Sequence, residues 1–279
     1  MTKILVIGGL GYVGTQLVPK LLENNYFVTV YDLGLYGCHL KSSPNLKIIN
    51  GDIRDIKKLE NIVKNQDIII HLACISNDPS FELNPRLGKS INFDCFEPLV
   101  LFAKKNGVKK FIFASSSSVY GVKDIKNVTE EASLEPLTDY SKFKMRCEEI
   151  LMSNTDNNFI GCAVRPATVC GYSPRQRLDL VVNILTNFAF HKKKIKVFGG
   201  KQLRPNIHIN DMVESYLLII RSNEKKIQTQ IFNVGFENYS VEKLATMVKE
   251  NIDGEVVLDI EESNDCLLYT SDAADDVRG

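Results

Sequence analysis

The stretch that decides the fold runs Lys3-Ile4-Leu5-Val6-Ile7-Gly8-Gly9-Leu10-Gly11-Tyr12-Val13-Gly14. It begins as a short apolar strand and continues into a turn with glycines at positions 8, 11 and 14, after which apolar residues recur at helical spacing. This order is typical of a dinucleotide site, because the glycines let backbone N–H groups approach a pyrophosphate and the helix N-terminus carries a partial positive charge. The alternative is a tight strand–helix turn that binds nothing. The residues expected to contact the cofactor are Gly8, Gly11, Tyr12, Val13 and Gly14.

An acidic residue at the end of the next strand indicates which dinucleotide binds. Phe27–Tyr31 is the second predicted strand, and Asp32 follows it, 18 residues after Gly14. A carboxylate in this place accepts hydrogen bonds from the adenosine ribose and repels a 2′-phosphate, which favours NAD over NADP. Asp52 and Ile53 follow the third predicted strand, where we expect them either to line the adenine or to form a simple turn.

Short apolar strands alternate with helical patterns as far as residue 165. This predicts an α/β fold, a doubly wound parallel sheet of the Rossmann type with helices on both faces. Beyond residue 165 the pattern loosens into loops rich in Gly, Pro and Arg, around predicted helices near Leu178–Phe190, Asp211–Ile220 and Ser240–Lys249 and a strand at Ile231–Val234. The strands predicted in the first part are Lys3–Gly8, Phe27–Tyr31, Leu46–Ile49, Asp67–His71, Lys110–Ala114 and Phe159–Arg165, and its longer helices lie around Arg86–Lys105 and Thr138–Leu151.

The same pattern predicts two regions and a tail. Residues 1–165 form the NAD-binding domain, whose sheet is completed by about 207–235, and residues 166–206 with 236–265 form a smaller substrate-binding region. Residues 266–279 resemble the in-frame translation of a sequencing-library adapter more than a natural polar tail. We therefore expect this last stretch to be foreign, and it carries no functional argument.

Composition argues against several classes of protein. The 279 residues carry 34 basic and 34 acidic side chains, so the net charge is zero and no nucleic-acid partner is expected. The seven cysteines form no CxxC pair and no Cys/His cluster with metal-ligand spacing, which disfavours disulfides and zinc. The N-terminus reads as a strand rather than a signal peptide, and no apolar run reaches the roughly 18 residues that cross a bilayer. A soluble protein of the reducing cytoplasm, without a metal or a membrane partner, is the expectation.

Two polar patterns suggest chemistry at the ends of buried elements. Tyr140 and Lys144 are spaced i and i+4, so they share one face of a predicted helix. The reference pKa of a phenol is about 10, and a nearby ammonium stabilises the phenolate, so this pair can take a proton from a hydroxyl. Ser115–Ser118 follow a buried strand, where side chains point into the crevice in which ligands bind. Taken alone, the first pattern has the alternative of an ordinary pair on a helix surface. The alternative for the serine run is the capping of a helix or turn.

Together these pieces resemble the extended short-chain dehydrogenase/reductase family, in its NAD-dependent epimerase/dehydratase branch. The resemblance implies that Ser116 is the catalytic hydroxyl, that Tyr140 is the base, and that Lys144 also holds the nicotinamide ribose. The matching residues, in the family's order between residue 3 and about residue 235, are Gly8–Gly14, Asp32, His71-Leu72-Ala73, Asn92, Ser116–Gly121, Tyr140 with Lys144, and Arg204–Asp211.

The resemblance adds further expectations for the cofactor side. Leu72 and Ala73 follow the fourth predicted strand and should line NAD, as should Pro166 after the sixth. Asn92 would lie on the helix beside the cofactor, in a structural role or a functional one.

The same resemblance implies a nucleotide-diphosphate sugar as the substrate. Residues 199–211 are similar to a family segment that ends in Arg-x-x-x-His-x-x-Asp, in which the arginine, here Arg204, reaches the diphosphate. A guanidinium suits this task because it stays charged and donates paired hydrogen bonds. Thr168 stands where the family often has an asparagine, and Ser117 follows the catalytic hydroxyl, so both are expected to contact the sugar. The family also implies a homodimer.

Several interpretations of the function stay open at this stage. Sugar dehydratases of the family place Asp-Glu directly after the catalytic hydroxyl residue, whereas this chain has Ser117-Ser118, which disfavours water loss. The leading interpretation is an NAD-dependent nucleotide-sugar epimerase that acts through a transient keto-sugar. The alternatives are a dehydratase, reductase or decarboxylase of the same family, or a non-catalytic dinucleotide-sensing protein. The last is disfavoured by the complete set of Ser116, Tyr140 and Lys144.

Overall fold

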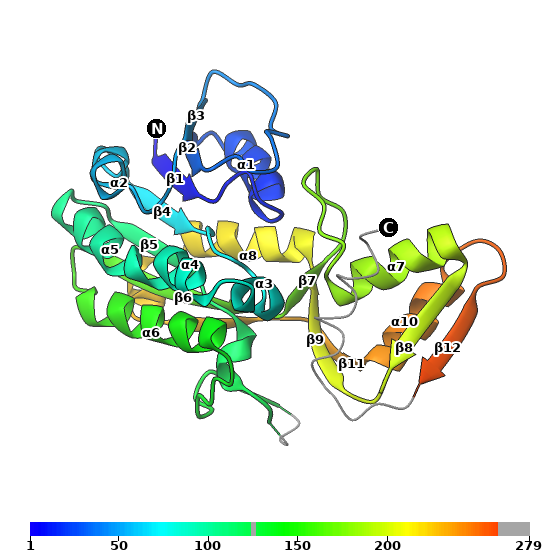
Figure 1. Ribbon diagram of the computed structural model, residues 1–279. Helices are drawn as coiled ribbons and strands as arrows, with labels where there is room; N and C mark the ends of the chain where they lie inside the picture. Colours follow the sequence, from blue (N-terminus) through cyan, green and yellow to red (C-terminus); the bar gives the residue numbers. More distant parts are fainter. Residues whose placement is uncertain (124–126, 262–279) are drawn as a thin grey trace. The chain divides into compact units, whose positions relative to one another are not determined.

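The computed structural model describes residues 1–123 and 127–261 (Figure 1). By its internal contacts the chain divides into two compact units. The first contains Met1–Pro166 and Asn210–Val234. The second contains Ala167–Ile209 and the described part of the chain from Gly235 onward.

The first unit is built on a seven-stranded sheet in which every neighbouring pair of strands is parallel. The strand order is β10-β6-β5-β4-β1-β2-β3, so the chain builds outward from β1 in one direction and then crosses back to build in the other. This is the doubly wound α/β arrangement that the sequence predicts. The strands are β1 (Lys3–Ile7), β2 (Phe27–Asp32), β3 (Leu46–Asn50), β4 (Ile68–His71), β5 (Lys110–Ala114), β6 (Ile160–Pro166) and β10 (Ile231–Val234).

Helices cover both faces of this sheet. One face packs against α2 (Ile56–Ile62), α5 (Phe96–Lys105) and α6 (Asp139–Asn154), and the alternate residues of the strands point into this core. The other face carries α1 (Gly14–Glu23) and α8 (Ile209–Arg221), which are joined where the Arg221 guanidinium donates to the Asn24 side chain. Pro19 lies inside α1, and the helix continues through it. The buried aromatic and aliphatic side chains of the first core include Leu5, Ile7, Ile69, Phe96, Leu99, Phe111, Phe113 and Leu151.

The long helix predicted over residues 86–105 is interrupted. It is preceded by a short helix α3 (Asp78–Glu82) and consists of α4 (Pro85–Lys89), a π-helical turn η1 (Ser90–Asp94) and then α5. Periodicity cannot reveal such a turn, because one extra residue shifts the apolar pattern only slightly. The turn lies beside β4, next to the predicted cofactor residues.

The second unit contains more regular structure than the predicted loops. It holds a three-stranded sheet of β7 (Thr168–Cys170), β9 (Leu203–His208) and β11 (Glu237–Ser240), in the order β11-β9-β7. A parallel pair, β8 (Lys194–Phe198) with β12 (Val257–Glu261), packs against α7 (Val181–Lys192) and α10 (Val241–Glu250). The expectation of loops after Arg165 was therefore wrong for three segments. The strand β7 has only three residues and β9 contains a proline, so both show little pattern, whereas β8 alternates between exposed and buried residues and could have been recognised.

The short elements that remain are η2 (Ser117–Tyr120), a single 3₁₀ turn, and α9 (Glu224–Ile227). Across residues 1–123 and 127–261, no helix is both long enough and apolar enough to span a bilayer. The adapter-like residues 266–279 lie outside the described part of the chain.

Lys110 joins helix α8 to the central sheet through two hydrogen bonds. Its Nζ donates to the carbonyl oxygens of Ile220 and Ser222 at 2.9 and 2.8 Å, at the C-terminal end of α8. The side chain is partly buried at the start of β5, and this burial lowers the pKa of its ammonium. Because the last carbonyl groups of a helix have no partner within the helix, a cation at this end stabilises it.

We expect Lys110→Met to lower the free energy of unfolding by about 1–3 kcal/mol, because the substitution keeps the apolar stem and removes both hydrogen bonds. Chemical denaturation measures this change. Lys109→Met is the matched control, since Lys109 is the exposed neighbour on the same strand end. Equal stability of the two variants would contradict the role given to Lys110.

Candidate functional site

The carboxyl ends of the parallel strands bring the predicted residues of the first unit to one edge of the sheet. Gly8 follows β1, Asp32 ends β2, Leu72 follows β4, Ser116 lies two residues after β5, and Pro166 ends β6. Neighbouring strands β2-β1-β4-β5-β6 therefore place these residues in a row. In open α/β sheets this edge is where ligands bind.

The glycine turn has the geometry of a close backbone approach. Gly8 has a φ of +84°, and a Cβ there would lie 2.5 Å from the backbone nitrogen of Ala73. A Cβ on Gly14 would lie 2.5 Å from the carbonyl oxygen of Gly9, so α1 starts directly against the turn. The N-cap residue Val13 provides no capping side chain, and the first turn of α1 holds no acidic residue. The first turn of α1 therefore keeps the partial positive charge that suits a phosphate.

Asp32 is fixed against the glycine turn by two backbone amides. Its Oδ2 accepts from the Leu10 nitrogen and its Oδ1 from the Gly34 nitrogen, both at 2.9 Å. Each carboxylate oxygen has further lone pairs, so the group can accept additional hydrogen bonds without moving. A fixed negative charge next to a phosphate-binding turn is the arrangement that distinguishes a ribose hydroxyl from a 2′-phosphate.

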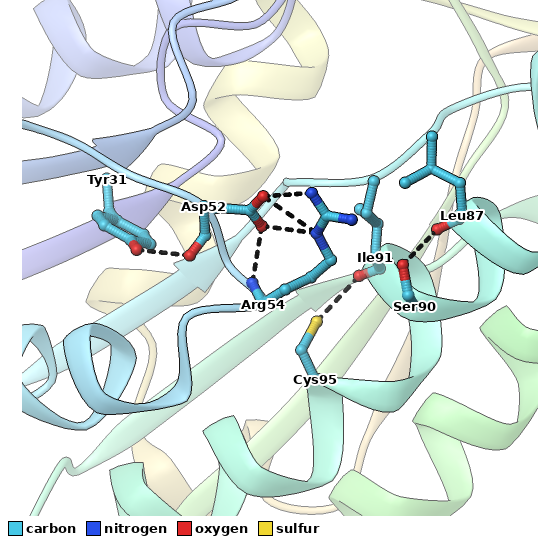
Figure 2. A network of polar contacts seen from close by, with 7 residues as sticks. All are labelled: Tyr31, Asp52, Arg54, Leu87, Ser90, Ile91 and Cys95. Atoms are coloured by element: carbon cyan, nitrogen blue, oxygen red, sulfur yellow. Dashed lines mark hydrogen bonds and ion pairs between the residues drawn. The ribbon is translucent and has the colours of Figure 1, made fainter.

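Asp52 and Ile53 have local partners of their own. Figure 2 shows the Asp52 carboxylate facing Arg54, whose Nη2 lies 2.5 Å from Oδ2 and whose Nε lies 3.0 Å from both oxygens. The Arg54 hydrogen bond is the main reason that the pKa of Asp52 is lowered. The Tyr31 hydroxyl donates to the Asp52 carbonyl oxygen at 2.7 Å, and Ile53 is buried in the core. Their contact with a cofactor stays a prediction.

Tyr140 and Lys144 lie one turn apart on α6 and are both buried, with 8% and 4% of their surface exposed. The helix begins at a capping box, in which the side chains of Thr138 and Ser141 each accept a hydrogen bond from the other's backbone nitrogen. Tyr140 thus lies in the first turn of a helix whose start is well defined. The Lys144 Nζ lies 5.8 Å from the centroid of the Tyr140 ring.

The Lys144 ammonium is buried beside the end of β5. Its Nζ donates to the Ala114 carbonyl oxygen at 2.6 Å and lies 4.9 Å from the centroid of the Phe113 ring. Burial acts to lower the pKa of Lys144, but the neighbouring Cys74 and Tyr140 act against it, and the pKa is raised overall. A cation is therefore kept beside the phenol, which favours the phenolate form of the phenol.

Ser116 is the N-cap residue of the turn η2, and its hydroxyl oxygen accepts two hydrogen bonds. Its Oγ accepts from the Ser118 nitrogen at 3.1 Å and from the Ser118 Oγ at 2.9 Å. Two donors occupy the lone pairs of this oxygen, so its O–H is left to donate to another group. Ser117 is the partly buried first residue of η2, and η2 packs against α6, which carries Tyr140.

Two buried residues of this site have roles that pattern analysis could not assign. Asn92, in the π-helical turn η1, accepts from the Ile75 nitrogen at 2.8 Å and donates to the Ile75 oxygen at 2.9 Å. It therefore pins the segment after β4 that contains Leu72 and Ala73, which favours the structural role. His71 is enclosed by Phe96 and Phe113, and burial lowers its pKa to about 3, so it stays neutral.

The second unit brings two predicted substrate residues onto neighbouring strands. Thr168 on β7 is paired with Asn206 on β9, and Arg204 lies two residues before Asn206. Residues two apart on a strand share one face, so Thr168 and Arg204 lie on the same face of the three-stranded sheet. Their place relative to Tyr140, in the first unit, stays a prediction.

The residues of the first unit fit a bound NAD. Gly8 and Gly14 leave room that a Cβ would fill, the N-terminus of α1 offers amides to a diphosphate, and Asp32 provides a fixed acceptor for ribose. Lys144 places a cation at the far end of the same row of strands. Cofactor and phenol can therefore meet at this edge.

Comparison with known proteins leads to the same assignment. The model of the NAD dependent epimerase/dehydratase family matches residues 4–235. A UDP-glucose 4-epimerase of Lactobacillus helveticus is 27% identical over 84% of this chain and 76% of its own length.

Two solved structures are similar over almost the whole chain. One is the UDP-glucuronic acid 4-epimerase of Bacillus cereus in complex with UDP-glucuronic acid and NAD, with a TM-score of 0.84, 25% identity, and coverage of 94% of this chain and 87% of that one. The other is the UDP-N-acetylglucosamine 4-epimerase of Methanobrevibacter ruminantium M1 with UDP-N-acetylmuramic acid, with a TM-score of 0.83, 26% identity, and coverage of 94% and 88%. With the glycine turn, Asp32 and the Tyr140–Lys144 pair in place, the chain is an enzyme of the NAD dependent epimerase/dehydratase family.

Proposed function

We propose that this chain is an NAD-dependent 4-epimerase of a UDP-sugar and acts through a transient keto-sugar. The observation that carries the proposal is the buried ammonium of Lys144, held by the Ala114 carbonyl oxygen beside the Tyr140 ring. The similar proteins compared above, which are named as 4-epimerases of UDP-sugars, support the choice of reaction. We further expect a cytoplasmic homodimer.

In this mechanism the chain's own residues move one proton and hold one oxygen. Tyr140, as the phenolate, accepts the proton of the sugar hydroxyl, and Lys144 stabilises the phenolate before the transfer. Ser116 donates its free O–H to the same sugar oxygen, which becomes a carbonyl and then a hydroxyl again. NAD⁺, which the glycine turn and Asp32 would hold, would supply the acceptor for the hydride of the sugar carbon and the donor for its return. Tyr140 gives the proton back, so no net redox change occurs.

Dehydration is the main competing reaction. It needs an acid and a base placed after the catalytic hydroxyl residue, and Ser117 and Ser118 stand in those positions. The Ser118 hydroxyl donates to Ser116 and so forms part of the turn. The absence of a carboxylate from these two positions supports epimerisation over loss of water.

Asp32→Ala should weaken NAD binding about tenfold or more, because a hydrogen bond to a charged group contributes about 1.5–3 kcal/mol. It should also relax the discrimination against NADP, since the negative charge that repels a 2′-phosphate is gone. Titration calorimetry with each dinucleotide measures both effects. Asp32→Asn keeps an acceptor and serves as the intermediate case. An unmodified protein that binds NADP as tightly as NAD would refute the assignment.

Arg204→Ala should weaken binding of UDP by about 2–3 kcal/mol and leave NAD binding unchanged, because the guanidinium is proposed to pair with the diphosphate. Calorimetry with UDP measures the loss. Lys201→Ala, an exposed cation that lies just before β9, is the matched control. If both variants bind UDP like the unmodified protein, Arg204 does not contact the diphosphate.

Tyr140→Phe tests the reaction itself. The ring can still pack, so folding and NAD binding should survive, while turnover should fall by at least the roughly 10²–10⁴-fold that general base catalysis supplies. In the unmodified enzyme the rate should rise with pH as the phenol ionises, because the deprotonated form accepts the proton.

The measurement is NMR of the products after incubation with NAD and UDP-, GDP-, CDP- or dTDP-sugars. We expect an inverted sugar and no net NADH from one of the UDP-sugars. A 4-keto-6-deoxy product would identify a dehydratase instead, and full activity of Tyr140→Phe would exclude this tyrosine as the base.

A further inference from the structure

A buried ion pair next to the catalytic residues has no part in the mechanism above. Glu148 on α6 and Arg165 on β6 are 3% and 2% exposed. Arg165 Nη2 lies 2.6 Å from Glu148 Oε2, and Nε lies 3.0 Å from Oε1, so the pair is bidentate. Burying two charges costs several kcal/mol of hydration per ion, and an apolar pair of similar volume is often at least as stable. Stability alone is therefore a weak reason for this pair.

The pair belongs to a series of hydrogen bonds that joins the end of β5 to α6. The Ala114 carbonyl oxygen accepts from Lys144, and the hydroxyl of the next residue, Ser115, donates to Glu148. The last residue of β5 and the residue that follows it are thus bound to two residues one turn apart on α6. Ser116 comes next in the chain, so its position follows directly from this series of hydrogen bonds.

The same pair holds the other end of the serine turn. Arg165 Nη1 donates to the Tyr120 hydroxyl at 2.8 Å, and its guanidinium lies 4.8 Å from the centroid of the Tyr120 ring. The Tyr120 hydroxyl donates in turn to Asn233 Oδ1 on β10 at 2.7 Å. Tyr120 is the last residue of η2, whose N-cap is Ser116. Both ends of the turn are therefore tied to the ion pair.

We propose that Glu148 and Arg165 are positioning residues, which set the place of the Ser116 hydroxyl relative to Tyr140. The inference rests on the proposed function, because it assigns to Ser116 the hydrogen bond to the reacting oxygen. The pair connects the helix that carries the base with the turn that carries the serine, and both of its members are buried. The Glu148 carboxylate accepts from Ser115 while the Arg165 guanidinium donates to Tyr120, so the pair holds both residues at the same time.

Glu148→Gln keeps the shape of the side chain and removes its charge. We expect kcat to fall by about 10–100-fold, since a displacement of about 1 Å at a catalytic group has this order of effect. KM for the UDP-sugar and the affinity for NAD should stay within about twofold, because the residues that bind them are unchanged. Glu149→Gln is the matched control, an exposed neighbour on the same helix that should keep full activity. Equal kcat in the two variants would overturn the proposal.

A double variant separates positioning from stability. Glu148→Leu combined with Arg165→Met leaves no buried charge unpaired, so its melting temperature should recover toward that of the unmodified protein. Under the proposal kcat stays low in this variant, because Ser115 and Tyr120 have lost their common partner. If kcat recovers together with the melting temperature, the pair is structural only.

Crystal structures of Glu148→Gln and Glu149→Gln provide a readout that needs no turnover. Ser116 should be displaced relative to Tyr140 in the first variant and not in the second. If the unmodified protein epimerises no UDP-sugar, the proposed function fails, and this comparison still decides whether the pair positions Ser116. Should Glu148→Gln not fold, Ser115→Ala removes the hydrogen bond to Glu148, and Tyr120→Phe removes those to Arg165 and Asn233. An unmoved Ser116 in both would refute the inference.

Discussion

The hydrogen bond from the Lys144 ammonium to the Ala114 carbonyl oxygen is the interaction on which the site depends. It joins the helix that carries Tyr140 to the end of the strand that leads into Ser116. A buried ammonium needs an acceptor, and a carbonyl at the end of a parallel strand provides one without a second buried charge. The cation then remains available to the phenol. The glycine turn and Asp32 lie along the same edge of the sheet, so the strand order brings the proposed cofactor-binding residues and Tyr140 to one edge.

The parts of the fold that could be predicted are those in which local patterns agree with the tertiary structure. The strands of the first unit are apolar runs bounded by turn residues, and each was expected within a residue or two of its observed bounds. The glycines at 8 and 14 could be interpreted because their spacing reflects a backbone constraint that no other residue meets. Tyr140 and Lys144 were predictable since helical spacing alone places them on one face.

The parts that could not be predicted depend on partners far away in the sequence. Arg165 and Glu148 are ordinary charged residues until β6 and α6 bring them together. The π-helical turn that holds Asn92 comes from one added residue, which periodicity does not register. The strands β7, β8 and β9 are short, and their pairing partners include β11 and β12, more than thirty residues later in the chain. For β7 and β9, local preference does not distinguish such segments from loops, whereas β8 carries an alternating pattern.

The order of the chain has a consequence for synthesis. The first unit is interrupted after Pro166 and resumes at Asn210, so its last strand, β10, is made after the segment Ala167–Ile209 of the second unit. Asn233 on that strand accepts from Tyr120 and thereby completes the polar network behind the serine turn. In a chain that emerges from the ribosome, the residues that contact the glycine turn, as far as Ala73, are made early. The serine turn, in contrast, gains its last hydrogen-bond partner only at Asn233. The glycine turn and Asp32 are therefore made well before the polar network behind the serine turn is complete.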